Sequence, residues 1–176
     1  MPISLPLPEW VRVVRMHDVE SATYQLTELL VDAQERGRVG RGELESAASQ
    51  IVDEAFREGV RLLGLVRPPG RPAALLSGMG LDLDVELDGE VGAVMSAWLA
   101  DRGGPGIAGL RTLGVDGVGT VVTLHRSDAS GAQAQAVLAE PDGTHWYLLT
   151  LAGQDDDRGP ELQDVLLDLV RGATVA

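Results

Sequence analysis

Residues 108–151, AGLRTLGVDGVGTVVTLHRSDASGAQAQAVLAEPDGTHWYLLTL, decide the fold of this 176-residue chain. Short runs rich in Val, Leu and Ala alternate with three groups of turn residues: Asp116-Gly117, the polar tip 127–131, and Pro141-Asp142-Gly143. Proline presets its own φ, glycine accepts a positive φ, and aspartate bonds to nearby backbone, so each group is suited to reverse the chain. The pattern predicts a four-stranded antiparallel meander with strands at 108–115, 118–126, 132–140 and 145–151.

Outside the meander, apolar residues that recur every three or four positions predict four helices. They cover about residues 19–36, about 44–58 with a stop at Gly59, a segment that starts at Asp88, and residues 160–171. We expect Asp88 to be the N-cap of the third helix, with Glu90 in its first turn, because carboxylates are favoured at helix N-termini. The run Asp155 to Asp157 is expected to cap the last helix for the same reason.

Three further strands are predicted at residues 10–15, 60–66 and 73–87, the last two joined by the turn Pro68-Pro69-Gly70. Seven strands joined mainly as hairpins favour an antiparallel sheet with helices packed on its faces. The predicted fold class is therefore α+β, with a largely antiparallel seven-stranded sheet flanked by helices. No internal repeat or long linker divides the sequence, so we predict one domain that spans residues 1–176.

The charge and composition exclude several functional classes. Twenty-seven acidic and 14 basic residues give a net charge of −13, which disfavours binding to nucleic acid or anionic lipid. The chain has no cysteine, which excludes disulfides, thiolate metal sites and a cysteine nucleophile. The first ten residues lack the positive region of a secretory signal, and no apolar stretch approaches the roughly 20 residues of a membrane helix. We expect a cytoplasmic monomer or homodimer that has no cofactor and binds another protein, not nucleic acid or a membrane.

Two motifs resemble known binding loops, but their contexts do not fit. Residues 104–109, GPGIAG, match the G-x-G-x-x-G dinucleotide motif, yet they follow a predicted helix and precede a predicted strand, which is the reverse of the order that binds phosphate. We interpret them as a helix-to-strand turn. Asp84-x-Glu86-x-Asp88 resembles the start of a calcium loop, but the twelfth position is Met95, where a bidentate Glu is required.

The histidines offer the main opening for catalysis. His17, His125 and His145 lie on separate predicted elements. His125 and His145 belong to strands that we expect to be neighbours in the meander, so the two rings could approach each other and bind a metal together with an Asp or Glu. Histidines that are exposed or hydrogen-bonded for structural reasons are commoner, and we expect that here.

Charged residues gather in two places that are candidates for partner binding. The alternating segment 81–88, LDLDVELD, puts its leucines and valine on one face and its acidic residues on the other. Near the start of the chain, arginines concentrate positive charge. The six candidate partner-binding residues are Asp82, Asp84, Glu86, Asp88, Arg12 and Arg15. A partner surface that meets residues 82–88 should be basic.

Several segments resemble known proteins. Pro8-Glu9-Trp10 is similar to the start of a set of uncharacterised proteins from high-GC actinobacteria. Residues 136–170, AVLAEPDGTHWYLLTLAGQDDDRGPELQDVLLDLV, resemble the ending of PsbP-like folds, and residues 115–126 resemble the preceding turn and strand of that group. The resemblance implies a PsbP-like α/β/α sandwich, a mostly non-enzymatic role and, for some relatives, a link to type VII secretion. It supplies no catalytic residues. The chain departs from the lipoproteins of this group because it lacks a signal peptide and a lipidation cysteine.

Together these observations predict a non-catalytic protein-binding or accessory protein, associated by resemblance with a secretion system. One alternative is an immunity or inhibitor protein for a basic toxin, which the acidic charge would help to attract. A second alternative is a small hydrolase or metal-dependent enzyme that uses His125 or His145.

Overall fold

The computed structural model describes residues 3–34, 39–81, 90–104, 106–140 and 145–175. The chain divides into two compact units, and each is described by itself below. Unit 1 comprises residues 1–8 and 80–176, and unit 2 comprises residues 9–79. The single domain expected from the sequence stays a prediction.

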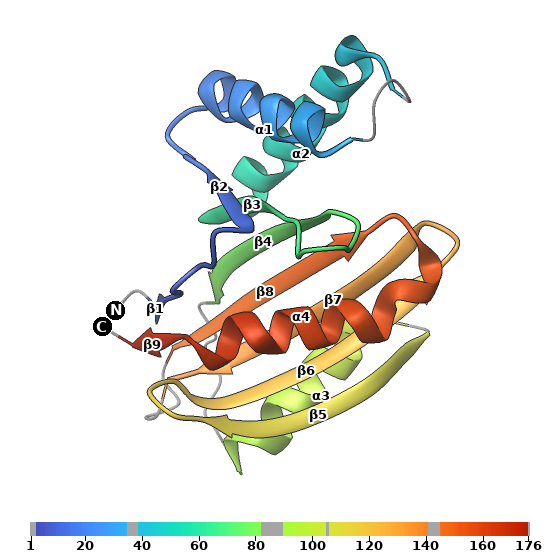
Figure 1. Cartoon of the computed structure of the whole chain (residues 1–176). Helices are drawn as coiled ribbons and strands as arrows, with labels where there is room; N and C mark the ends of the chain where they lie inside the picture. The colour runs from blue at the N-terminus through green and yellow to red at the C-terminus, as the bar shows by residue number, and fades with distance from the viewer. Residues whose placement is uncertain (1–2, 35–38, 82–89, 105, 141–144, 176) are drawn as a thin grey trace. The chain divides into compact units, whose positions relative to one another are not determined.

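Unit 2 is a three-stranded antiparallel sheet with a pair of helices (Figure 1). Its strands pair in the order β2-β3-β4, and β4 ends just beyond the boundary of the unit. Its elements in chain order are β2 (Val11–Val14), α1 (Val19–Ala33), α2 (Arg41–Glu58), β3 (Leu62–Val66) and β4 (Ala74–Leu81).

The ends of both helices in unit 2 follow from local chemistry. The backbone N–H of Ser21 donates to the Asp18 carboxylate at 2.7 Å, so Asp18 caps α1. Gln34 is extended and ends α1 at Ala33, three residues before the predicted end. Gly59 ends α2 as predicted, because its φ of 75° is one that glycine adopts without strain.

The core of unit 2 lies between the helices and one face of the strands. It contains small and aliphatic side chains, and the helices approach closely because alanines occupy several contact positions. The buried members are Val14, Ala22, Leu26, Leu29, Ala48, Val52, Ala55, Leu63 and Leu65.

Unit 1 contains the meander, with strand order β8-β7-β6-β5 and antiparallel pairing throughout. The meander predicted from residues 108–151 is therefore confirmed. A short strand pair also joins β1 to β9 near the two ends of the chain. The elements in chain order are β1 (Ile3–Ser4), α3 (Val91–Gly103), β5 (Ile107–Val115), β6 (Gly119–Asp128), β7 (Gly131–Ala139), β8 (Trp146–Gly153), the 3₁₀ turn η1 (Asp156–Arg158), α4 (Gly159–Arg171) and β9 (Thr174–Val175).

Helices α3 and α4 cover opposite faces of this sheet, which makes unit 1 a three-layer sandwich (Figure 1). The strand β6 is consequently buried on both faces from Val121 to Leu124. On the α4 side, β7 carries three fully or almost fully buried alanines at 132, 134 and 136, whose small side chains let the helix approach the sheet. On the α3 side, Trp98 meets Trp146 edge to face, with ring centroids 6.2 Å apart.

The turns behave largely as their residues predict. Gly117 has a φ of 82°, and the Val118 N–H donates to the Val115 carbonyl at 3.1 Å, which closes the β5–β6 turn. Gly104 and Gly106 lie between α3 and β5, as predicted for a helix-to-strand turn, whereas residues 107–109 belong to β5 itself. The turn at Pro141-Asp142-Gly143 lies outside the described residues.

Among the described residues, four helices and the seven strands β2 to β8, antiparallel within each unit, form an α+β protein, so the predicted fold class is confirmed. The predicted N-caps of α3 and α4 were both wrong. Glu90 is the N-cap of α3, and Asp88 lies outside the described residues. Asp156 and Asp157 are in η1, and Arg158 precedes α4 without a side-chain cap, because the 3₁₀ turn separates the acidic run from the helix. No helix in the described part of the chain is long and apolar enough to span a membrane.

Candidate functional site

The predicted partner-binding residues separate into two groups. Asp82, Asp84, Glu86 and Asp88 lie outside the described residues. Arg12 and Arg15 are exposed at β2 and its end, and their role in partner binding stays a prediction. The structure therefore locates only the basic part of the predicted set.

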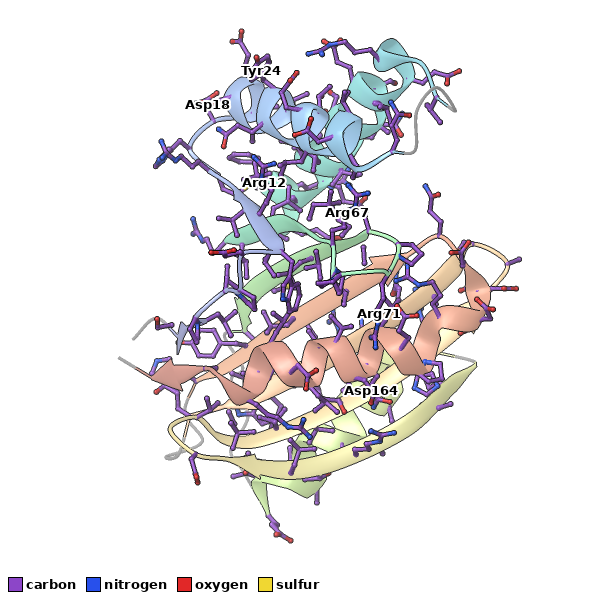
Figure 2. All side chains as sticks on the ribbon, in the orientation of Figure 1. Arg12, Asp18, Tyr24, Arg67, Arg71 and Asp164 are labelled. Carbon is purple, nitrogen blue, oxygen red and sulfur yellow. The ribbon has the colours of Figure 1, made fainter. Side chains whose placement is uncertain are left out.

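Arg12 is engaged within unit 2. Its guanidinium lies 3.4 Å from the Asp32 carboxylate near the end of α1, and both side chains are about two-thirds exposed. The Arg67 guanidinium donates to the backbone carbonyl of Asp32 at 3.2 Å, so two arginines meet the last turn of a helix that contains no basic residue there. Figure 2 labels both arginines, and also Tyr24, which is 64 % exposed on α1. These two arginines therefore stabilise the end of α1 through contacts within unit 2.

His125 and His145 do not come together, because the expectation that their strands are neighbours was wrong. Strand β7 lies between β6 and β8. The register pairs His125 with Ala134, whereas His145 lies opposite Glu140, which is six positions beyond Ala134 and directly follows β7. At about 3.3 Å per residue, the two histidines are roughly 20 Å apart along the strands. The sequence predicted the β6–β7 and β7–β8 hairpins correctly, but it did not show that the two histidines lie at opposite ends of β7.

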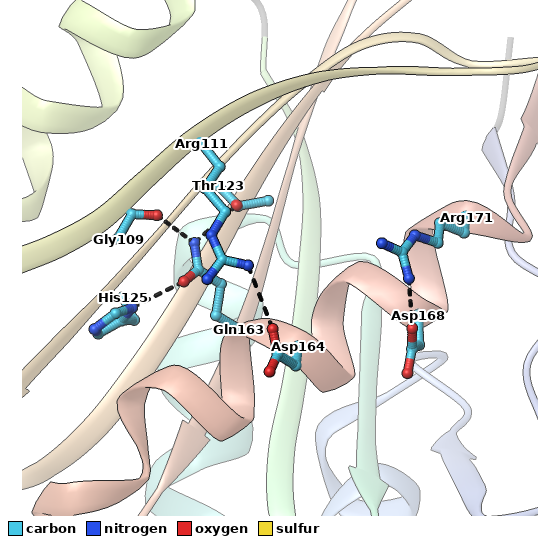
Figure 3. A network of polar contacts seen from close by, with 8 residues as sticks. All are labelled: Gly109, Arg111, Thr123, His125, Gln163, Asp164, Asp168 and Arg171. Atoms are coloured by element: carbon cyan, nitrogen blue, oxygen red, sulfur yellow. Dashed lines mark hydrogen bonds and ion pairs between the residues drawn. The ribbon is translucent and has the colours of Figure 1, made fainter.

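His125 instead belongs to a buried polar network beneath α4 (Figure 3). Gln163 is fully buried, and its amide nitrogen donates to the Thr123 hydroxyl at 2.9 Å and to the Gly109 carbonyl. The amide oxygen is therefore the acceptor for His125 Nδ1, which lies 2.9 Å away. This arrangement places the proton of neutral His125 on Nδ1 and ties α4 to β5 and β6.

The network depends on a bulge in β5. The register with β6 shifts between Ala108 and Arg111, and Gly109 has a φ of 64°. A Cβ at Gly109 would lie 2.5 Å from the His125 ring and 2.6 Å from the Gln163 amide oxygen. Only glycine fits this position. Beside it, Arg111 lies 3.4 Å from the Asp164 carboxylate of α4 (Figure 3).

A second polar cluster surrounds a buried carboxylate at the ends of β7 and β8. Glu140 is 8 % exposed, His145 Nδ1 lies 3.3 Å from one carboxylate oxygen, and the Tyr147 hydroxyl donates to the other at 3.3 Å. Burial first, and then the charge and hydrogen bond of Glu140, raise the pKa of Tyr147 above its ordinary 10.0. Among the described residues, no group of three or more His, Asp or Glu side chains is arranged to hold a metal ion.

The edge strand β5 is largely exposed. Among the described residues, β5 pairs with β6 alone, and residues 108–112 are five successive exposed positions. Leu110, a large apolar side chain, is 49 % exposed. An edge strand presents backbone N–H and C=O groups that can pair with another strand. The part from Arg111 to Val115 pairs regularly with β6, so its outer side has the geometry of an ordinary strand.

A pocket of about 390 Å³ lies next to this regular part of β5. Residues 112–114 of β5, Thr120 of β6 and residues 90–92 at the start of α3 line it. Within this described lining, Glu90 is the single ionisable residue. Thr112 and Ser96 of α3 are in hydroxyl contact at 3.2 Å, which holds one wall of the pocket against the helix.

The charge of the chain is concentrated in the unit that contains this edge. Unit 1 has 16 acidic and five basic residues, a net charge of −11. Unit 2 has 11 acidic and nine basic residues, a net charge of −2. The geometry and the charge together make the β5 edge, with its pocket, the candidate functional site. The sequence analysis identified neither the edge nor the pocket.

No family model and no curated protein matches the chain. Among solved structures, the chain is similar to LpqN, which is described as involved in cell envelope biogenesis of Mycobacterium tuberculosis. The two are 16 % identical with a TM-score of 0.47, and the match covers 98 % of this chain and 82 % of that chain. A likeness of this strength supports no statement about the function of this chain.

Proposed function

We propose that the chain is a non-catalytic accessory protein that binds another protein. The observation that carries the proposal is the β5 edge, where residues 108–112 are exposed in succession and the strand has a described partner on one side only. Such an edge is suited to pair with a segment of another protein, which is a common mode of peptide recognition.

Other parts of the proposal rest on the sequence. The absence of cysteine and of nucleophile or nucleotide motifs supports a non-catalytic role. The cytoplasmic location and the monomeric or homodimeric state remain part of the proposal. The PsbP-like grouping and the association with a secretion system are supported by the resemblance of residues 136–170. The genes that flank this one would test the link to secretion.

Affinity purification from the native cell tests the proposal. The full chain is the bait, and an unrelated folded protein of the same net charge is the control, since an acidic surface captures basic proteins unspecifically. We expect a protein partner in stoichiometric amount with the chain and not with the control. Recovery of a bare monomer or dimer, with no partner above the control, would contradict the proposal.

Inhibition of a basic toxin is a second candidate, favoured by the net charge of −11 in unit 1. Complementary charge accelerates the association of such pairs. Co-expression with a toxin from a neighbouring gene should then restore growth, and failure of every such toxin to be neutralised would exclude this role.

An enzymatic alternative rests on His145 and its buried partner Glu140, 3.3 Å apart. A carboxylate can orient a histidine as a general base. If a variant with both His125→Gln and His145→Gln keeps its metal content and all screened activities, this alternative fails.

A further inference from the structure

We infer that the regular part of β5, Arg111–Val115, and the pocket beside it form a docking site for an extended basic segment of the partner protein. The segment adds to β5 as a fifth strand of the sheet in unit 1. This inference rests on the proposed protein-binding function and names the chemistry of the partner.

Backbone pairing would supply the affinity. The bulge between Ala108 and Arg111 disturbs the first half of β5, whereas residues 111–115 keep a one-to-one register with β6. A strand in regular register presents its outward N–H and C=O groups at the spacing that an added strand needs. The bulge limits unspecific pairing along the rest of the edge. The docking stretch is therefore short and defined.

The pocket would supply the specificity. Successive side chains of an added strand point to opposite faces of the sheet, so every second one lies on the α3 face. There the pocket of about 390 Å³ opens beside residues 112–114, with the Glu90 carboxylate in its lining. Glu90 is exposed and has no side-chain capping bond to α3. A long cationic side chain can enter the pocket and meet this carboxylate.

Charge selects the occupant. A basic segment is attracted by the net charge of −11 in unit 1, whereas a second copy of the chain would bring the same negative charge to the edge. The positive charge of Arg111 on the opposite face is countered by Asp164, 3.4 Å away. A basic strand is therefore favoured over self-association.

Titration with synthetic peptides tests the inference on the full chain. The probe is a capped heptapeptide of alternating valine and arginine, and the matched peptide has glutamate in place of arginine. We expect the arginine peptide to bind at least about tenfold more tightly, because like charges oppose the glutamate peptide. Amide NMR signals of residues 111–114 and 90–92 should shift, and binding should weaken in about 0.5 M salt, which screens charges beyond a few ångström.

Three variants locate the site. Gly114→Arg places a cation at the pocket, and a Cβ there meets no atom within 4 Å, so the fold should tolerate it. Gly42→Arg on α2 makes the same charge change at another open glycine and is the control. We expect Gly114→Arg to weaken the arginine peptide about tenfold and Gly42→Arg to change binding less than about twofold. Glu90→Gln should weaken it about two- to fivefold, as for one partly exposed ion pair.

Clear outcomes would overturn the inference. These are equal affinity for both peptides, shifts confined to residues outside 90–92 and 107–115, equal effects of Gly114→Arg and Gly42→Arg, or dimerisation of the free chain through β5. The proposed function fails separately. A native partner that binds Gly114→Arg normally would exclude this docking site and leave protein binding intact, whereas absence of any partner would exclude protein binding whatever the peptides do.

Discussion

The two units use charge and sheet edges in opposite ways. Unit 2 holds nine of the 14 arginines and is almost neutral, and its edge strand β2 has four residues. Unit 1 has a net charge of −11, and its edge strand β5 has nine residues. In unit 2 the side chains of Arg12 and Arg67 contact Asp32 near the end of α1. The backbone N–H of Arg15 donates to the side chain of Gln25, which is also on α1.

The two edges differ in length and in what lies beside them. At β2 the edge has four residues, and the Arg15 N–H just beyond it donates to Gln25 of α1. The longer edge at β5 is limited by one bulge, and a pocket lies beside its regular part. We propose the longer edge, with its pocket, as the one that binds a partner.

The largest effect is expected at the bulge of β5. Gly109→Val would combine a left-handed backbone, which costs about 1–2 kcal/mol for a side chain, with overpacking against His125 and Gln163, which costs about 1–3 kcal/mol. We expect the free energy of unfolding to fall by about 2–5 kcal/mol in urea denaturation. The control Gly114→Ala, in open space on the same strand, should change it by less than about 1 kcal/mol. Equal losses in the two variants would show that the bulge does not hold the network.

A somewhat smaller effect is expected from Gln163. The substitution Gln163→Leu keeps the side-chain volume but leaves the buried Thr123 hydroxyl and the Gly109 carbonyl without this partner. Each unsatisfied buried group costs about 1–3 kcal/mol, so we expect a loss of about 2–4 kcal/mol. The control in unit 2 is Gln50→Leu, at an exposed position on α2, with an expected change below about 0.5 kcal/mol. Thermal unfolding of both variants decides, and a neutral Gln163→Leu would refute the structural role of the network.

The two tyrosines, one in each unit, allow a pH test. The pKa of Tyr147 is raised above 10.0, so the folded protein keeps this proton to higher pH than the unfolded chain. Stability from this group is complete below pH 10.0 and is lost as the pH rises through the folded pKa. In a Tyr24→Phe background, tyrosinate absorbance should report a single titration above pH 10, and Tyr147→Phe should reduce the alkaline loss of stability. A titration at or below pH 10.0 would contradict the buried contact with Glu140.

The smallest effects are expected for the two exposed ion pairs. Arg12→Ala removes a partner of Asp32 in the nearly neutral unit, and Arg111→Ala removes a partner of Asp164 in the acidic unit. Each should cost less than about 1 kcal/mol, with Arg111→Ala the larger at low salt because it adds to an excess of negative charge. Urea denaturation should show the difference disappear in about 0.5 M salt. A larger cost for Arg12→Ala at low salt would break the charge contrast between the units.

Periodicity predicted much of the fold because each helix and strand has one clear apolar pattern. The helix stop at Gly59 and the turn at Asp116-Gly117 appear as predicted, since glycine conformation is a local property. The end of α1 was placed three residues too late, because nothing in the spacing reveals that Gln34 turns extended. The expected cap of α4 by Asp155 to Asp157 was wrong. Acidic residues also occur at the start of a 3₁₀ turn, and here they begin the turn η1 that precedes α4.

Neither the candidate site at β5 nor the buried polar network around Gln163 was predicted, for reasons that differ by residue. Gln163 lies three positions before Leu166 and seven before Val170, so a polar residue on the apolar stripe of α4 was a readable signal of a buried bond. Gly109 was recognised only as part of a turn, because a bulge depends on the register of β5 with β6. The difference in net charge between the two units can be calculated only when the boundaries of the units are known. The exposure of β5 depends on which strand ends the sheet, and strand order is not a local property.

The pairing that we propose joins a basic strand to the outer side of β5. The most direct test is a measurement of nuclear Overhauser effects between the isotope-labelled chain and the unlabelled arginine peptide. We expect cross-strand contacts from the backbone of the peptide to residues 111–114, together with slower amide exchange in the same stretch. Contacts to any other surface, or binding without new protection in β5, would contradict this pairing.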